Sequence, residues 1–454
     1  MTLPNIHVSC YLEVGKLGEN SKIVSRREVI SGAIKAGVFT AATLPMVVPR
    51  HCVAGSKMSP PSETITVGII GTGKMAFDYH IPTLLGIDDV RIVAVSDVDK
   101  TRRAAARTMI EQRYTKDSRA GTRCDDYNDY HTIILHSGVD AVLIATPEHW
   151  HAIPIIEACK AGKDVYCEKP LTLTLAESKR CIEAVRKHKR VLQTGSQQRS
   201  NVFGQFRQAV EFIRSGRIGT IKSVTVGVGA PSKWCDLPEE EMEKDLDWNL
   251  WLGPAPNRPY NSILSPRGRH KHFPAWRSYR EYSGGAHADM GAHHYDIVQW
   301  ALGMDDSGPV EIIPPADPNA QSGVKLRYAN GIEVTHGGPS GCVFTGTKGT
   351  LHIDRGELTS DPAEAVKEPL GEKEVHLPES PGHHRNWLNC IKSRARCIAD
   401  VEIGARTIAM VQLGNLAYWN HETIKWDPKN WNFAEGTGKA SWLDRERRIA
   451  IPKA

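Results

Sequence analysis

The sequence predicts an α/β protein in which a doubly wound parallel sheet precedes an α+β domain with a large, mostly antiparallel open sheet. Over residues 64–194, short apolar strands alternate with helical segments, which is the pattern of a parallel sheet covered by helices on both faces. Beyond residue 194 the β segments lengthen, and Asn330-Gly331 separates two of them. Because both residues of that dipeptide tolerate positive φ, a tight antiparallel hairpin is expected there.

The individual elements follow from the apolar periodicity of each segment. In the first half we expect strands at residues 64–70, 90–96, 141–146, 164–167 and 190–193, and helices at 77–85, 100–113 and 153–161. In the second half we expect strands at residues 221–228, 324–328, 332–336, 343–345 and 350–353. Helices are expected to pack against this second sheet at residues 285–302, 385–396 and 405–419.

The N-terminal residues predict an export signal. Residues 25–30 (SRREVI) resemble the twin-arginine motif, an apolar run rich in Ala and Gly follows, and residues 52–54 offer small side chains for cleavage. The alternatives are a flexible tail or a permanent membrane anchor; the charge, glycines and proline inside the run argue against the anchor. We therefore expect a signal segment at residues 1–54, a linker at 55–63 and an exported, periplasmic protein. A misread signal would leave the protein cytoplasmic.

The composition is that of a soluble globular protein, with 40% hydrophobic and 24% charged residues. Residues 1–54 hold six Lys/Arg and three Asp/Glu, so the remainder holds 51 basic and 49 acidic residues and a formal charge of +2. This balance, without a basic stripe, excludes nucleic acid as the expected partner. The ten cysteines form no CxxC pair, so we expect mostly free buried thiols and no zinc site.

The turn over residues 71–76 has the spacing of a dinucleotide-binding loop. It reads Gly71-Thr72-Gly73-Lys74-Met75-Ala76. The first glycine permits the tight turn, the second lets the backbone approach a pyrophosphate, and the small third residue packs the helix on the strand. The loop follows a predicted strand and opens a helix, which is the context that such a site requires. We therefore expect a Rossmann domain that binds NAD.

Asp97, at the end of the second strand, is expected to select the cofactor. A carboxylate there can accept hydrogen bonds from the adenosine ribose and repel a 2′-phosphate, which favours NAD over NADP. Arg102 and Arg103 lie close by in the sequence and would soften that preference. The alternative interpretation of Asp97 is an N-cap of the following helix.

Three further residues predict proton-transfer chemistry. Lys169 follows a buried strand and precedes Pro170, where an ammonium group can donate to a substrate oxygen. Asp289 and His293 lie four residues apart on a predicted helix and share one face. An imidazole with a pKa near ~6.5 can take a hydroxyl proton while a carboxylate fixes its tautomer. Each residue also has a structural interpretation. Lys169 could be a lysine in a surface loop, Asp289 an acid in the first turn of a helix, and His293 a histidine of the core. A divalent-metal site is the weaker alternative, because third and fourth ligands are missing.

Together these motifs resemble the glucose–fructose oxidoreductase / inositol dehydrogenase (Gfo/Idh/MocA) family over nearly all of the chain beyond the signal. The matching segments are residues 71–76, Thr146-Pro147-Glu148-His149-Trp150-His151, Glu168-Lys169-Pro170, Gly195-Ser196-Gln197-Gln198-Arg199, Trp276-Arg277, Gly284-Gly285 with Asp289 and His293, and residues 382–394 and 400–404. Near the end, Gly404-Ala405-Arg406 replaces the Gly-His-Arg that is usual in the family.

The resemblance implies a role for each motif. Lys169, Asp289 and His293 would form the catalytic group and, with Arg277, contact the substrate; the Lys169–Pro170 peptide bond would be cis. The cofactor site would be lined by residues 71–76, Asp97, Thr146, Pro147, His149, His151, Glu168, Lys169, Gln197, Trp276 and Arg277. A Rossmann domain at residues 64–194 would precede a substrate domain at 195–454, whose open sheet would form a homodimer or homotetramer.

We therefore expect an oxidoreductase that uses tightly bound NAD to oxidise or reduce a secondary alcohol of a sugar, polyol or glycoside. The first alternative is redox-neutral glycoside cleavage through a 3-keto intermediate, and the second is a non-enzymatic sugar- or nucleotide-binding sensor. An insertion over residues 230–280, absent from shorter members of the family, is expected to form a substrate-side lid. Because of this insertion, the resemblance does not identify the substrate.

Overall fold

Residues 63–117 and 123–454 are the part of the chain that the computed structural model describes. The expected signal segment and residues 55–62 of the linker lie outside these residues. Within them, no helix combines the length and the apolar character needed to cross a membrane.

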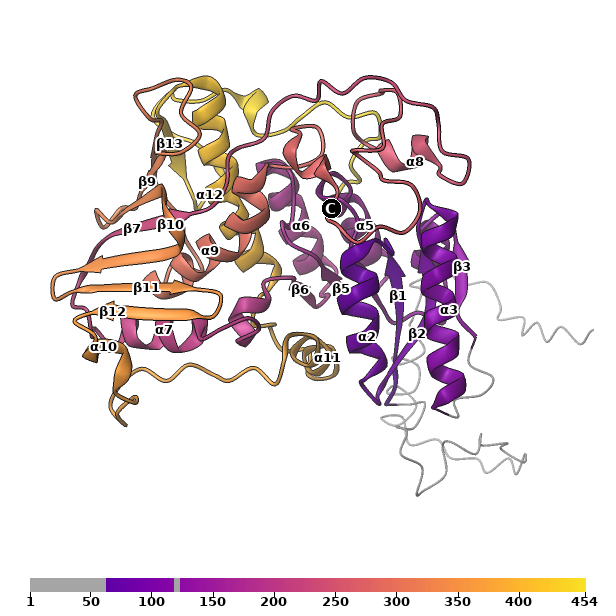
Figure 1. Cartoon of the computed structure of the whole chain (residues 1–454), viewed down its shortest axis with the longest axis horizontal. Coiled ribbons are helices and arrows are strands. Elements are labelled where there is room, and N and C mark those ends of the chain that lie inside the picture. Colours follow the sequence, from indigo (N-terminus) through magenta and orange to yellow (C-terminus); the bar gives the residue numbers. More distant parts are fainter. Residues whose placement is uncertain (1–62, 118–122) are drawn as a thin grey trace, which may run out of the picture. The chain divides into compact units, whose positions relative to one another are not determined.

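The first sheet has six strands in the order β3-β2-β1-β4-β5-β6 (Figure 1). They are β1 (Ile65–Ile70), β2 (Val90–Ser96), β3 (Asp125–Tyr127), β4 (Ala141–Ile144), β5 (Asp164–Cys167) and β6 (Leu192–Thr194). Neighbouring strands pair in parallel, which confirms the expected doubly wound arrangement. The strand order reverses between β1 and β4, so the loops at their carboxyl ends diverge and leave a crevice.

Helices cover both faces of this sheet. Along β1 the side chains alternate, so Val67 and Ile69 join an apolar cluster on one face whereas Ile70 joins the cluster on the other. The helices of this half are η2 (Ala76–His80), α2 (Ile81–Leu85), α3 (Lys100–Lys116), α4 (His131–Leu135), α5 (Glu148–Lys160) and α6 (Leu175–Lys187). The helix expected at residues 77–85 is thus a π turn followed by a short α-helix, and α5 begins five residues earlier than expected.

The second sheet has eight strands in the order β12-β11-β10-β9-β8-β13-β14, with β7 paired to β10. They are β7 (Ile221–Gly227), β8 (Glu311–Ile313), β9 (Lys325–Arg327), β10 (Glu333–Gly346), β11 (Thr350–Asp354), β12 (Glu357–Asp361), β13 (Ile424–Asp427) and β14 (Asn432–Phe433). The pairs are antiparallel, as predicted. Gly331, with φ +85°, turns the chain from β9 into β10. The strands expected at residues 332–336 and 343–345 are parts of one strand, β10.

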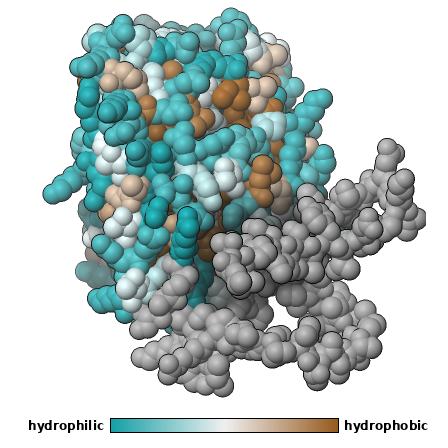
Figure 2. Space-filling view, turned by 90° about the vertical axis from the view of Figure 1, so that its right-hand side faces the viewer, coloured by the Kyte–Doolittle hydropathy of each residue, from teal (hydrophilic) through white to brown (hydrophobic). Residues whose placement is uncertain are grey.

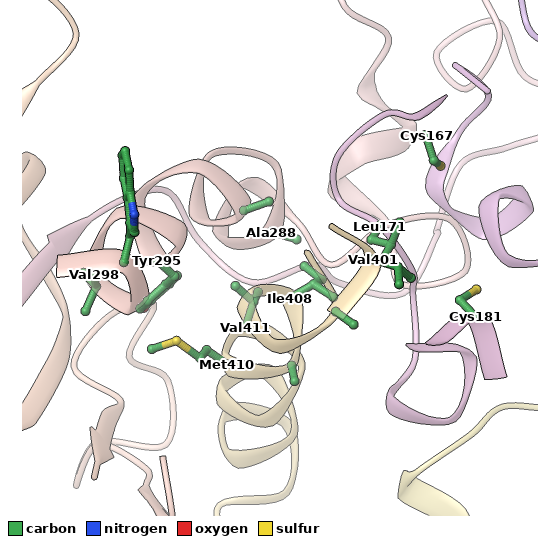
Figure 3. Close-up of a cluster of buried hydrophobic side chains, with 14 of the residues drawn as sticks. Cys167, Leu171, Cys181, Ala288, Tyr295, Val298, Val401, Ile408, Met410 and Val411 are labelled. Atoms are coloured by element: carbon green, nitrogen blue, oxygen red, sulfur yellow. The ribbon is translucent and has the colours of Figure 1, made fainter. Parts of the chain in front are cut away.

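Two long helices, α9 (Ala286–Leu302) and α12 (Val401–Asn420), form the core between the two halves. Figure 3 shows Ala288 and Tyr295 of α9 facing α12, which contributes Ile408 and Val411 to the same buried cluster. Leu171, from the loop after β5, belongs to that cluster too. Shared packing of this kind holds the loops of the first sheet against the helix that carries Asp289 and His293.

One expected helix packs elsewhere than predicted. The helix α11 (His383–Ser393) was expected to lie against the second sheet, but Trp387, Leu388 and Ile391 are buried with β1 and β5 residues of the first sheet. The spacing of apolar residues in α11 is the same whether the helix packs on the first sheet or on the second. The sequence pattern therefore does not tell which sheet the helix covers. The remaining helices are α7 (Phe206–Arg214), α8 (Trp248–Leu252), α10 (Glu364–Lys367), η3 (Gln197–Ser200), η4 (Ala275–Ser278) and η5 (Ala440–Trp442).

The surface on the side of α3 and β3 is mostly hydrophilic, with apolar residues scattered in small groups (Figure 2). All eight cysteines of the described residues are free, and seven of them are buried, as expected for cysteines that behave as small apolar side chains.

Candidate active site

A cavity of about 310 Å³ opens at the carboxyl ends of the parallel strands. Its walls come from the glycine turn, the loops after β2, β4 and β5, the insertion and α9. The expected site residues that line it are Gly71, Gly73, Lys74, Met75, Asp97, Thr146, Pro147, His151, Glu168, Lys169, Gln197, Trp276, Arg277, Asp289 and His293. Thr72, Ala76 and His149 lie outside its lining.

The glycine turn leaves room for a ligand where a dinucleotide loop requires it. Gly71 has φ +87°, and a Cβ there would lie 2.9 Å from the backbone of Ala145 and Thr146. A Cβ on Gly73 would meet nothing within 4 Å, so this backbone is open to approach. Ala76 is fully buried in the domain core, which explains its absence from the cavity. Each position has the property that a pyrophosphate-binding turn needs.

Asp97 lies at the cavity with both carboxylate oxygens held in place. Oδ2 accepts from the backbone N of Thr72 at 2.7 Å, and Oδ1 accepts from the backbone N of Asp99 at 2.9 Å. The cap of α3 is Asp99, which accepts from the backbone N of Arg102 at 2.9 Å. Asp97 is therefore not the N-cap of α3.

Arg102 and Arg103 are already engaged by protein groups. Arg102 Nε donates to the carbonyl of Gly268 at 3.0 Å, and its guanidinium also bonds the carbonyl of Pro266. Arg103 Nη1 donates to the carbonyl of Asp97 at 3.0 Å. Bonds of this kind reduce the softening effect that the two arginines were expected to have on NAD preference.

Lys169 and Asp289 form an ion pair in the cavity. Lys169 Nζ donates to Asp289 Oδ1 at 2.7 Å and to the Asp289 carbonyl at 2.9 Å. The Lys169–Pro170 peptide bond is cis, as the resemblance implied. Arg277 Nε lies 3.4 Å from the same Oδ1. Burial raises the pKa of Asp289, but the charges of Lys169 and Arg277 outweigh it and bring that pKa to about 2.

The expected partnership between Asp289 and His293 is wrong. Asp289 directs its carboxylate to Lys169 and Arg277, and His293 Nδ1 has no hydrogen-bond partner among the described residues. A shared helical face puts two residues close together, but the stronger cationic partners decide where the carboxylate points. Burial first, and then the charge of Lys169, lower the pKa of His293 well below its ordinary value. The imidazole is therefore neutral at pH 7.

Glu148 is a cavity residue that the sequence analysis did not single out. It is 1% exposed, and its carboxyl oxygens accept from Ser283 Oγ at 2.7 Å and from the backbone N of Gly284 at 3.3 Å. Burial raises the pKa of Glu148 to about 8. The sequence shows that Glu148 belongs to the Thr146–His151 motif. It does not show that Ser283, 135 positions later, donates to its buried carboxyl group.

Glu168 is an ionised carboxylate behind the lysine. Its Oε1 accepts from Gln197 Nε2 at 2.7 Å and lies 3.0 Å from His80 Nε2. Burial raises the pKa of Glu168, and the contacts with His80, Lys169 and Gln197 together more than offset this, so the pKa is lowered. Gly195 packs against it, since a Cβ there would lie 2.6 Å from Oε1.

His149 and His151 have different places although they are two residues apart. His151 lines the cavity with both ring nitrogens 2.8 Å from carbonyl oxygens, those of Pro170 and Thr146. His149 Nε2 lies 3.0 Å from the carbonyl of Trp251. The assignment of His149 to the cofactor lining is therefore wrong, because its ring faces the insertion.

The insertion contacts the loop after β2 at the cofactor end of the cavity, and its Arg277 also reaches Asp289. The backbone N of Lys100 donates to the Asp245 carbonyl at 3.0 Å, and the backbone N of Asp247 donates to the Val98 carbonyl at 3.0 Å. Trp150 Nε1 donates to the Trp251 carbonyl at 3.0 Å. The insertion also has its own apolar core, which includes Leu246, Trp251, Leu252, Tyr260 and Leu264. It is thus a packed wall that closes over the nucleotide-binding loops.

The C-terminal residues reinforce this wall. Arg445 Nη2 donates to the carbonyl of His149 at 2.9 Å, and its Nη1 donates to the carbonyl of Glu281 at 3.1 Å. Arg445 and Arg447 both pair with Glu177 of α6.

The described residues contain no group of three or more His, Cys, Asp or Glu side chains that could hold a metal ion.

Family models match both halves of the chain. The model described as "Oxidoreductase family, NAD-binding Rossmann fold" matches residues 65–196, and "Oxidoreductase family, C-terminal alpha/beta domain" matches residues 212–451. The chain belongs to the Gfo/Idh/MocA family of oxidoreductases. Its first domain is an NAD-binding Rossmann domain, and the open glycine turn, Asp97 and the unpartnered buried hydroxyl of Thr146 fit that cofactor.

The most similar curated relatives include inositol dehydrogenases. Inositol 2-dehydrogenase 1 of Saccharopolyspora erythraea is 39% identical over 139 residues, which is 30% of this chain and 38% of that protein. Myo-inositol 2-dehydrogenase of Thermotoga maritima is 34% identical over 155 residues, 34% of this chain and 42% of that protein. These matches span less than half the length of either relative.

Solved structures share the fold at low identity. The WlbA dehydrogenase from Bordetella pertussis, in complex with NADH and UDP-GlcNAcA, has a TM-score of 0.55 and 20% identity, and the match covers 80% of this chain and 99% of that one. The aldose-aldose oxidoreductase from Caulobacter crescentus, complexed with glycerol, has a TM-score of 0.53 and 18% identity with the same coverage.

Proposed function

We propose that the protein interconverts a secondary alcohol and a ketone on a sugar, polyol or glycoside, using NAD that stays bound between turnovers. One observation carries this proposal: the Lys169–Asp289 pair and the neutral His293 line the same cavity as the dinucleotide turn. An acid, a base and a nicotinamide site in one enclosure are what alcohol oxidation requires. The inositol dehydrogenases among the relatives support a polyol or sugar as substrate.

The roles follow from the contacts of each residue. NAD, when bound, supplies the hydride acceptor; residues 71–76 and Asp97 would hold its pyrophosphate and ribose. His293 accepts the hydroxyl proton through a ring nitrogen. Lys169 donates a hydrogen bond to the same oxygen and stabilises the negative charge that develops there. Asp289 keeps the Lys169 ammonium in place, which makes it a positioning residue for the lysine rather than for the histidine.

Glu148 favours redox-neutral glycoside cleavage as a second candidate. That reaction needs an additional group that exchanges a proton with the carbon next to a transient ketone. A cavity-lining carboxyl group whose pKa burial raises to about 8 is suited to this task near neutral pH. A sugar- or nucleotide-binding sensor needs none of the proton-transfer groups, and so we rank it last.

Product analysis separates these functions. The purified protein is mixed with a panel of sugars, polyols and aryl glycosides, while the absorbance of bound NADH and the products are followed. A ketone with accumulating NADH supports alcohol oxidation, and a released aglycone without net NADH supports cleavage. Binding with neither product would refute both. Lys169→Met should lower the yield of either product, and Lys163→Met is its matched control, because the Lys163 ammonium bonds the His136 and Val139 carbonyls outside the cavity.

We propose further that the protein is exported and acts in the periplasm. An exported enzyme meets little free NAD, so the cofactor must load before export and be retained. Retention through repeated dialysis requires sub-micromolar affinity, about −8 kcal/mol or better. Fusion of residues 1–54 to a reporter tests the signal: export should depend on Arg26 and Arg27. A reporter that stays in the cytoplasm even with Arg26 and Arg27 in place would overturn this proposal.

We also propose that the second sheet pairs two copies of the chain into a homodimer, or two such dimers into a tetramer. Outward side chains of β10 such as Thr335, Val343 and Thr345 are partly exposed, so this face is available to a second copy. Light scattering on the purified protein tests it, and a monomer at micromolar concentration would refute it.

A further inference from the structure

Arg355 is a cavity residue that the functional roles above leave unexplained. It lies in the turn between β11 and β12, and its side chain lines the cavity that also holds His293. The turn is anchored where the backbone N of Gly356 donates to the Phe203 carbonyl at 3.2 Å. The guanidinium of Arg355 lies 4.6 Å from the centre of the Phe203 ring. The aromatic ring therefore holds the charge at the exposed mouth of the cavity.

Among residues 63–117 and 123–454, the guanidinium of Arg355 has no acidic or carbonyl hydrogen-bond partner. Within the described residues, five Lys and Arg side chains line the cavity, and the other four, Lys74, Arg102, Lys169 and Arg277, each contact a carboxylate. The neighbouring Asp354 does not serve, because it accepts from the backbone N of Arg355 and faces His294 at 3.6 Å. An arginine that lines a cavity and lacks a protein partner is available to a ligand.

The charge balance at this end of the cavity is positive. Lys169, Arg277 and Arg355 contribute three cations, and the carboxylates of Asp289 and Glu168 oppose them. Glu168 is paired with His80, and Glu148 is mostly protonated at pH 7 because burial raises its pKa to about 8. The Arg355 side chain is exposed at the mouth of the cavity; partial burial lowers its pKa, and the nearby charges of Asp354 and Asp289 oppose this. A bound anion would relieve the excess charge.

We propose that Arg355 binds an anionic group of the substrate, so that the protein acts on acidic sugars, carboxylated or phosphorylated, in preference to neutral polyols. The proposal rests on the proposed function, since it names the substrate class of the same cavity. A planar guanidinium binds a carboxylate or a phosphate through two parallel hydrogen bonds. With Phe203 behind it, Arg355 would fix the end of the substrate remote from the carbon that reacts near Lys169 and His293.

Calorimetric titration of the NAD-loaded protein tests the inference without requiring turnover. The probes are matched sets: glucose, glucuronate, gluconate and glucose 6-phosphate, with the corresponding galactose and mannose compounds. At least one acid should bind on the order of 10- to 100-fold more tightly than its neutral counterpart, the range expected for a charge-assisted pair. The preferred set of acids, carboxylates or phosphates, identifies the source of the anion.

Substitution at Arg355 completes the test. Arg355→Gln should remove the preference, and Arg355→Lys should restore part of it. Lys348→Gln, which removes a charge from the exposed β10–β11 turn outside the cavity, should leave the preference unchanged. Thermal unfolding of each variant reports whether it is folded.

Two results would overturn the inference. In the first, every acid binds less than threefold more tightly than its neutral counterpart. In the second, Arg355→Gln retains the preference for acids. If a neutral polyol is oxidised while Arg355→Gln has no effect, the proposed function stands and this inference fails. If acids bind through Arg355 but no probe is oxidised or cleaved, the inference stands and the proposed function fails.

Discussion

Replacing Lys169 by Met removes the ammonium group that binds Asp289 while keeping an unbranched side chain of similar length. The side chain of Lys169 donates to Oδ1 and to the carbonyl of Asp289, so the variant loses both a substrate contact and a carboxylate partner. We expect kcat to fall by ~10²-fold or more, which corresponds to about 2.7 kcal/mol of transition-state stabilisation. NAD content should be unchanged, because the glycine turn is intact.

The same substitution should change how stability depends on pH. The pKa of Asp289 is about 2 in the folded protein against an ordinary value of 3.8, a difference worth about 2 kcal/mol. Because the folded pKa is the lower one, this stabilisation is present above about pH 4 and is lost as pH falls towards 2. The carboxylate side chain is 29% exposed, so solvent screening makes 2 kcal/mol an upper value. Without Lys169, the pKa of Asp289 should rise and the acid-dependent part of the stability should shrink.

Urea unfolding at pH 7 and at pH 3, together with steady-state kinetics and measured NAD content, provides the assay. Lys163→Met is the control for losing a buried ammonium group: it should lower stability and leave kcat near the wild-type value. The double variant Lys169→Met/Asp289→Asn should be less impaired in stability than the sum of its single changes, because each partner is costly mainly when left alone. A Lys169→Met protein with kcat within threefold of wild type would refute the catalytic assignment.

Four further predictions follow from the site. His293→Ala should lower kcat by ~10²-fold or more with NAD retained, and because burial keeps the folded imidazole neutral, wild-type kcat should show no loss attributable to this group between pH 8 and 6. Gly71→Ala should abolish NAD binding measured by fluorescence, since the new Cβ would lie 2.9 Å from backbone atoms; normal affinity would contradict the turn's role. Asp97→Ser should reduce the wild-type preference for NAD over NADP. A wild-type protein that prefers NADP would exclude Asp97 as the residue that selects NAD. Gly253→Ala should speed NAD loss in dialysis, because a Cβ at its φ of +48° would lie 2.1 Å from the ring of Trp150; unchanged retention would show that the wall is dispensable.

Local sequence patterns were sufficient for most elements and for the chemistry of single motifs. The strands β2 and β5 begin and end at the expected residues, because strands of a covered parallel sheet are largely apolar. Gly71 is required by its own φ angle and by its close neighbours. The turn at Gly331 likewise follows from a dihedral preference that a dipeptide carries wherever it occurs. Such features depend on residues that are adjacent in the chain, so one sequence suffices to find them.

Tertiary structure decided which distant groups meet. Asp289 was expected to hold His293, four residues away, but its carboxylate is bound to Lys169, 120 positions earlier. The apolar face of α11 was visible, and yet it covers the first sheet instead of the second. The free charge of Arg355 also emerges only when the cavity lining is known. In each case the sequence specifies a capacity, a charge or an apolar face, and the choice among possible partners depends on distances that only the packed fold sets.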